Sequence, residues 1–122
     1  MKTLRLFLTL FFVAAVMMGC DKSSSAVNKA YDKAANGGTA IEVANILTEK
    51  ELDFKQLDSK EFAKLGACID FIRIKGQFTE DFTQQVNTER YNKLLEDFSR
   101  MEASQSDAER NERATYLEKL LN

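Results

Sequence analysis

Residues 58–76 read DSKEFAKLGACIDFIRIKG and hold the strongest helical pattern in the chain. Large apolar side chains recur there at steps of three and four residues, which places them along one face of a helix. They are Phe62, Leu65, Ile69 and Ile72, with Cys68 and Phe71 on the same side. Asp58 or Ser59 supplies an N-terminal cap, and Lys75-Gly76 supplies a basic last turn followed by a stop. We therefore predict a core helix across this segment.

Two more helices are predicted before this segment. Residues 26–35 end at Asn36-Gly37-Gly38, which accept the left-handed conformation with which helices terminate. Thr39-Ala40-Ile41-Glu42 then has the form of a capping box, in which the two polar side chains satisfy free backbone amides. The helix that starts there is expected to run to about residue 52. Phe54 and Leu57 are expected to pin the next connection to the core.

Two further helices are predicted after residue 76. One covers residues 80–101, and its polar stretch 83–88 is where we expect it to bend or fray. Ser106-Asp107-Ala108-Glu109 forms a capping box for the last helix, whose apolar positions are Ala114, Leu117, Leu120 and Leu121. The chain has no proline and almost no period-two alternation, so strands have little support. These patterns predict an all-α fold, a small antiparallel bundle of four to five helices.

The N-terminal segment has the layout of an export signal. Lys2 and Arg5 give it a positive start, and residues 6–18 form an apolar run of thirteen residues that only Thr9 interrupts. As a helix this run would span about 20 Å, which is short of the roughly 30 Å hydrocarbon core of a bilayer. A permanent transmembrane helix is therefore the weaker interpretation.

The end of this segment, Val16-Met17-Met18-Gly19-Cys20, resembles the lipobox of bacterial lipoproteins. It departs from that pattern at Met17, where the lipobox usually has Leu, Val or Ile, and at Met18, where a small residue is common. The resemblance implies cleavage after Gly19, a thioether between the Cys20 thiol and diacylglycerol, and two or three acyl chains on Cys20 in all, of which two suffice for stable anchoring. An uncleaved membrane anchor and an ordinary cleaved signal are the alternatives.

The predicted organisation follows from this resemblance. Residues 1–19 would be the signal peptide, residues 20–25 the lipidated cysteine with a flexible polar tether, and residues 26–122 the helical domain. Asp21 looks like the signal that retains lipoproteins in the inner membrane of Gram-negative bacteria. It would place the domain on the periplasmic face of that membrane. Asp21 is otherwise only the first residue of the tether.

Missing residue types exclude several chemistries. The chain has no histidine, which removes serine–histidine and cysteine–histidine nucleophile pairs and histidine ligands for zinc or haem iron. Gly37-Gly38 lacks the sequence context of a phosphate-binding loop. Beyond the signal segment, fifteen basic residues face nineteen acidic ones, a balance that does not favour nucleic acid. We expect no metal, no cofactor and no enzymatic activity.

Cys68 is the only other cysteine and cannot form an intramolecular disulfide once Cys20 carries lipid. It lies within an apolar stripe, so burial as a small hydrophobic residue is the preferred interpretation. Pairing between two copies and, less so, catalysis are the alternatives. The small residues Ala63, Gly66 and Ala67 predict close approach of a neighbouring helix, or else a groove for a partner or apolar ligand.

Charged clusters are interpreted as solvated surface. They comprise Glu49, Glu51 and Asp53, and the run Asp107, Glu109, Arg110, Glu112 and Arg113. Their spacing suits helical ion pairs and not a calcium loop. Tyr31 and Tyr116 fall outside the main apolar stripes, so we expect them to be exposed contacts.

The preferred function is that of a non-catalytic envelope lipoprotein, which binds or positions another protein near the membrane. It depends on the anchor and on the absence of catalytic groups. The alternative is an immunity, exclusion or inhibitor lipoprotein that neutralises an incoming toxin or enzyme. A carrier of an apolar ligand would need an internal cavity, for which the sequence gives no sign.

Overall fold

The computed structural model describes residues 22–76 and 80–122. The predictions for Gly19, Cys20 and Asp21 lie outside this part of the chain. The described residues form six α-helices and one short 3-10 helix, and they include no strand. The helices are α2 (Lys22–Ala35), α3 (Ala40–Thr48), η1 (Phe54–Gln56), α4 (Ser59–Lys75), α5 (Glu80–Gln85), α6 (Thr88–Glu102) and α7 (Asp107–Leu121). The predicted all-α helical bundle is confirmed.

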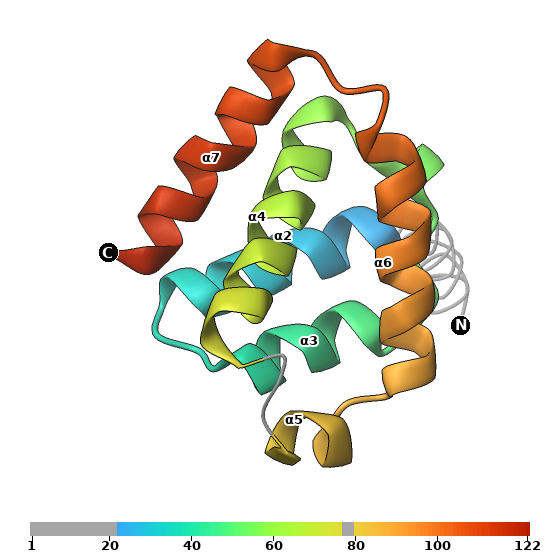
Figure 1. Cartoon of the computed structure of the whole chain (residues 1–122), viewed down its shortest axis with the longest axis vertical. Coiled ribbons are helices and arrows are strands. Elements are labelled where there is room, and N and C mark those ends of the chain that lie inside the picture. Colours follow the sequence, from blue (N-terminus) through green and yellow to red (C-terminus); the bar gives the residue numbers. More distant parts are fainter. Residues whose placement is uncertain (1–21, 77–79) are drawn as a thin grey trace, which may run out of the picture.

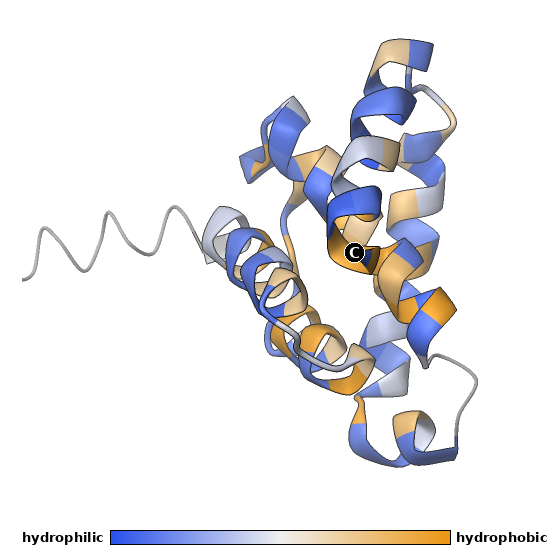
Figure 2. Ribbon diagram, turned by 90° about the vertical axis from the view of Figure 1, so that its left-hand side faces the viewer, coloured by the Kyte–Doolittle hydropathy of each residue, from blue (hydrophilic) through white to orange (hydrophobic). Residues whose placement is uncertain are grey.

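Helix α4 lies at the centre of the arrangement (Figure 1). Helices α2 and α3 form an antiparallel pair that packs on one side of α4, and α6 and α7 flank α4 and run in opposite directions. Hydrophobic and hydrophilic residues are interspersed along the helices in Figure 2. Buried apolar side chains from α2, α3, α4, α5, α6 and α7 form one core cluster.

The predicted core helix is confirmed. Asp58 caps α4 by accepting the Glu61 N–H (2.8 Å), and Glu61 in turn accepts the Asp58 N–H (3.0 Å). The nine buried residues of α4 include all four of the predicted apolar positions. The capping boxes Thr39–Glu42 and Ser106–Glu109 also form as predicted. Phe54 and Leu57 are half-buried and pack on the core, as expected.

The predicted helix over residues 80–101 is wrong in one respect, because it is two helices. Helix α5 ends at Gln85 and α6 begins at Thr88. Asn87 has extended backbone angles, and its side chain accepts the Arg90 N–H (3.1 Å) as a helix cap. Asparagine favours such caps over helix interiors, since its side chain competes for backbone amides. The expected weak point has become a break.

The helix predicted to reach residue 52 ends earlier, at Thr48. A cation from another helix satisfies its free carbonyls, because Arg90 Nη1 donates to the carbonyl oxygens of Thr48 (3.0 Å) and Glu49 (2.8 Å). A basic group at a helix C-terminus is also favoured by the helix dipole. This tertiary contact fixes the end of α3, and no local sequence pattern encodes it.

The predicted flexible tether is also wrong where the structure describes it. Residues 22–25 belong to α2, so the helical domain begins before residue 26. Ser23 is only 3% exposed, and its Oγ accepts the Asp53 N–H (2.7 Å). A run of serines suggests a linker by composition, but here the first of them meets a buried backbone donor that needs a partner.

The patch of small residues on α4 receives α7, as the close-approach interpretation predicted. A Cβ atom added at Gly66 would lie 2.7 Å from Arg113 Cδ and 3.0 Å from Phe98 Cζ. No real side chain tolerates such contacts unless its neighbours move. Glycine at this position therefore makes room for the Arg113 side chain of α7.

Arg113 makes an ion pair across this interface. Its Nε donates to Asp70 Oδ2 and its Nη2 to Asp70 Oδ1, both at 2.8 Å, which is a bidentate geometry. Its Nη1 lies 3.1 Å from Glu102 Oε1, and its guanidinium carbon lies 5.0 Å from the Phe98 ring centre. The Arg113 side chain is 12% exposed. The prediction of a solvated charged face is therefore wrong for Arg113.

The apolar contact of α7 is confined to a few side chains. Leu120 is its only buried residue, Leu117 and Tyr116 are half-buried and pack on the core, and Ala114 and Leu121 are exposed although their spacing had suggested a core position. The Arg113 pair with Asp70 adds a polar contact between α7 and α4 to this packing.

Asp70→Asn should lower the free energy of unfolding by about 2 kcal/mol, because the buried guanidinium loses its charged bidentate partner. Urea unfolding followed by circular dichroism measures the change. Glu96→Gln is the matched control, since the Glu96–Arg100 pair is exposed and such pairs contribute about 0.5 kcal/mol or less. Equal losses in the two variants would contradict the role assigned to the buried pair.

Candidate functional site

Cys68 is the one predicted site residue within the described part of the chain. Its side chain is fully buried on α4, which confirms the preferred interpretation. Burial raises the pKa of the thiol to about 12, although the nearby Lys64 ammonium acts in the opposite direction. The thiolate is the reactive form of cysteine. Cys68 is thus unsuited to nucleophilic chemistry in the folded protein.

The two tyrosines expected as exposed contacts instead join α2 to α7. Tyr31 is 8% exposed, so that prediction is wrong for it, and Tyr116 is half-buried. Their rings meet edge to face with centres 5.4 Å apart. Lys64 Nζ lies 5.3 Å from the Tyr31 ring centre and 5.8 Å from that of Tyr116. Both tyrosines therefore serve packing and a cation–π contact.

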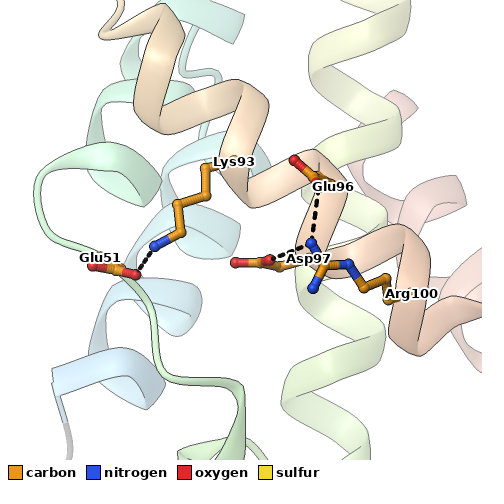
Figure 3. Close-up of polar contacts among 5 residues, drawn as sticks. All are labelled: Glu51, Lys93, Glu96, Asp97 and Arg100. Carbon is orange, nitrogen blue, oxygen red and sulfur yellow. Dashed lines mark hydrogen bonds and ion pairs between the residues drawn. The ribbon is translucent and has the colours of Figure 1, made fainter.

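The acidic group Glu49, Glu51 and Asp53 is exposed, as expected of a solvated surface. Glu51 pairs with Lys93 of α6, and this hydrogen bond lowers the pKa of the Glu51 carboxyl. Figure 3 shows this pair beside a second one, in which Arg100 contacts Glu96 (2.8 Å) and Asp97 (3.8 Å). The Glu51–Lys93 pair joins α6 to the α3–η1 connection, and the contacts of Arg100 lie within α6.

The cavity beneath this ion-pair surface is small. It has a volume of about 20 Å³ and is lined by residues that include Leu47, Leu52, Phe54 and Leu94. Such a space holds no more than a water molecule. This cavity is therefore too small for a ligand of the size of a cofactor.

A larger concave surface lies along the exposed side of α3. One hollow, of about 540 Å³, lies between α2 and α3 and is lined by residues that include Lys33, Asn36, Glu42 and Ile46. A second hollow, of about 490 Å³, lies between α3 and the α5–α6 connection and includes Glu49, Gln85 and Asn87. Both share Asn45 and Ile46, so we call them together the α3 groove.

The α3 groove is shallow and wide open, and polar and charged residues supply most of its lining. Its charged residues are already partly paired, since Lys33 Nζ lies 3.2 Å from Glu42 Oε2. Ile46 is a half-buried apolar side chain at the junction of the two hollows. Small-molecule sites are usually enclosed and mostly apolar, whereas an open polar rim around an apolar centre is typical of protein interfaces.

Two structural findings bear on chemistry and membranes. Within residues 22–76 and 80–122, no three acidic or cysteine side chains come together as ligands for a metal ion. No helix in that part of the chain combines the length and the hydrophobicity that crossing a bilayer requires. The α3 groove is therefore the most extended concave surface among the features described above.

Cys68 should react with a thiol reagent such as DTNB only as fast as the protein opens, because the thiol is buried and its pKa is raised. The measurement compares the native protein at pH 8 with the same protein in urea. Ser99→Cys is the control, since Ser99 is exposed on α6 and its cysteine should react at once. Prompt reaction of Cys68 in the native protein would contradict its assigned burial.

Comparisons with known proteins identify no relative. The chain matches no protein-family model, and no curated protein or solved structure matches it. Neither the fold nor a ligand can therefore be carried over from another protein. The function must be inferred from the residues of this chain and from their arrangement.

Proposed function

We propose that this protein is a non-catalytic lipoprotein of the cell envelope, which binds another protein near the membrane. The observation that carries the proposal is the order of signals in the first twenty residues. A positive start, an apolar run, Gly19 and Cys20 follow one another as in a lipobox, and a folded domain begins within three residues of Cys20. The thiol of Cys20 would carry the acyl chains that hold the domain at the bilayer.

Asp21 supports a position at the inner membrane. It occupies the place directly after the modified cysteine, where an aspartate resembles the retention signal of Gram-negative lipoproteins. The domain would then lie on the periplasmic face. The absence of histidine and the burial of Cys68 support a role other than catalysis.

The α3 groove supports a protein partner. It is open, and its lining includes the amide-bearing residues Asn36, Asn45, Gln85 and Asn87. Backbone groups of a bound segment are suitable partners for such amides, while Ile46 offers a central apolar contact. We propose that a segment of the partner protein lies along this groove.

Cys20→Ala should move the protein from the membrane fraction to the soluble periplasmic fraction, because the acyl chains are the proposed anchor. Fractionation after an alkaline wash measures this, and mass spectrometry of the wild type should find an acylated N-terminal Cys20. Asp21→Ser is the companion variant, which should keep the lipid but shift to the outer membrane. An intact N-terminal methionine or an unmodified Cys20 would refute the proposal.

A photo-crosslinking amino acid at Asn45 should capture a discrete partner in intact cells, because Asn45 lies at the junction of the groove. The matched control is the same amino acid at Ser99, an exposed position about 18 Å further along α6 than the groove residue Asn87. Equal products at both positions would argue against the groove. The identity of the captured protein separates a resident envelope partner from an incoming toxin.

A further inference from the structure

The first turn of α2 is fastened to the connection that precedes α4. The Ser23 N–H donates to Gln56 Oε1 (3.3 Å), and Ser23 Oγ accepts the Asp53 N–H (2.7 Å). Ser23 is 3% exposed. The start of α2 is therefore held against η1 by two hydrogen bonds and by burial.

The same end of α2 is also joined to the first turn of α4. Ser24 Oγ donates to Glu61 Oε2, and Asn28 Nδ2 donates to the same oxygen (3.0 Å). Six exposed residues belong to η1, to its N-cap, and to the N-cap and first turn of α4. We call them the anchor face, and they are Asp53, Lys55, Gln56, Asp58, Ser59 and Lys60.

Covalent geometry limits how far this face can lie from a lipid on Cys20. Two residues lie between Cys20 and Ser23, so the chain takes three residue steps, which span at most about 11 Å when fully extended. Helix α4 has seventeen residues and is about 25 Å long. The attachment point is thus closer to the anchor face than that face is to the opposite end of α4.

We propose that the anchor face rests against the headgroup surface of the membrane, with the Lys75 end of α4 directed away from it. This inference rests on the proposed lipidation of Cys20. In this arrangement the domain has a defined orientation relative to the membrane, whereas a flexible tether would let it rotate freely. The partner is a lipid surface, and the contact is set by the short covalent connection.

The charges of the anchor face are consistent with this arrangement. Lys55 and Lys60 are balanced by Asp53 and Asp58, so an anionic bilayer neither attracts nor repels the face as a whole. The orientation should therefore depend on the covalent link and not on salt. Electrostatic binding, in contrast, would weaken as the ionic strength rises.

Two exposed lysines at opposite ends of α4 test the orientation. They are separated by fifteen residues, or about 22 Å along the helix. Lys60→Cys and Lys75→Cys are made in the full lipidated protein, in which Cys20 is acylated and Cys68 is buried. Each is labelled with a fluorophore and reconstituted into phosphatidylethanolamine–phosphatidylglycerol liposomes whose headgroups carry a nitroxide quencher.

The expected result is quenching several-fold stronger at position 60 than at position 75, unchanged between low and high salt. A twelve-residue Gly/Ser insertion between Asp21 and Lys22 should abolish the difference, because such a linker reaches about 19 Å and frees the domain to rotate. Equal quenching in the original chain overturns the inference, as does a difference that survives the insertion. Mass spectrometry of each sample distinguishes this failure from a missing lipid, which would overturn the proposed function as well.

Discussion

The bidentate contact between Arg113 and Asp70 is the interaction that sets how the last helix, α7, lies on α4. Gly66 leaves space for the arginine stem, and Phe98 places its ring beneath the guanidinium. Burying a charge is costly unless its hydrogen bonds are satisfied, and here Asp70 and Glu102 satisfy them. A helix with one buried side chain, Leu120, is thereby given a fixed place on α4.

The local pattern of the sequence was enough to find the helices that carry their own signals. Asp58, Thr39 and Ser106 each begin a capping box, and the stripe of α4 alternates at helical spacing, so these elements are encoded within a few residues. The end of α3 is different in kind, because Arg90 lies more than forty residues away from the carbonyls that it caps. The break at Asn87 is intermediate between local and tertiary control. The polar stretch 83–88 indicates a weak point, but the pattern does not indicate that Asn87 caps a new helix.

The candidate sites divide in the same way. Burial of Cys68 could be predicted because its neighbours in the stripe are apolar, whereas the α3 groove could not, because it is formed by side chains from three separate segments. The prediction that Arg113 is solvated is wrong because mixed-charge helices are solvated in most proteins. The only sign of its burial is Gly66, which leaves space for the arginine side chain. Pairing a glycine on one helix with an arginine on another requires knowledge of which helices meet.

If the chain is exported as proposed, the position of Cys68 within α4 has a consequence for how it matures. An oxidising compartment acts on any thiol that it meets, and disulfide exchange requires an accessible sulfur. This sulfur is buried in the folded domain, so the time taken to fold sets the interval in which cross-linked by-products arise. Rapid folding of a helical domain, which is rich in local contacts, would therefore shorten the time in which Cys68 can be oxidised.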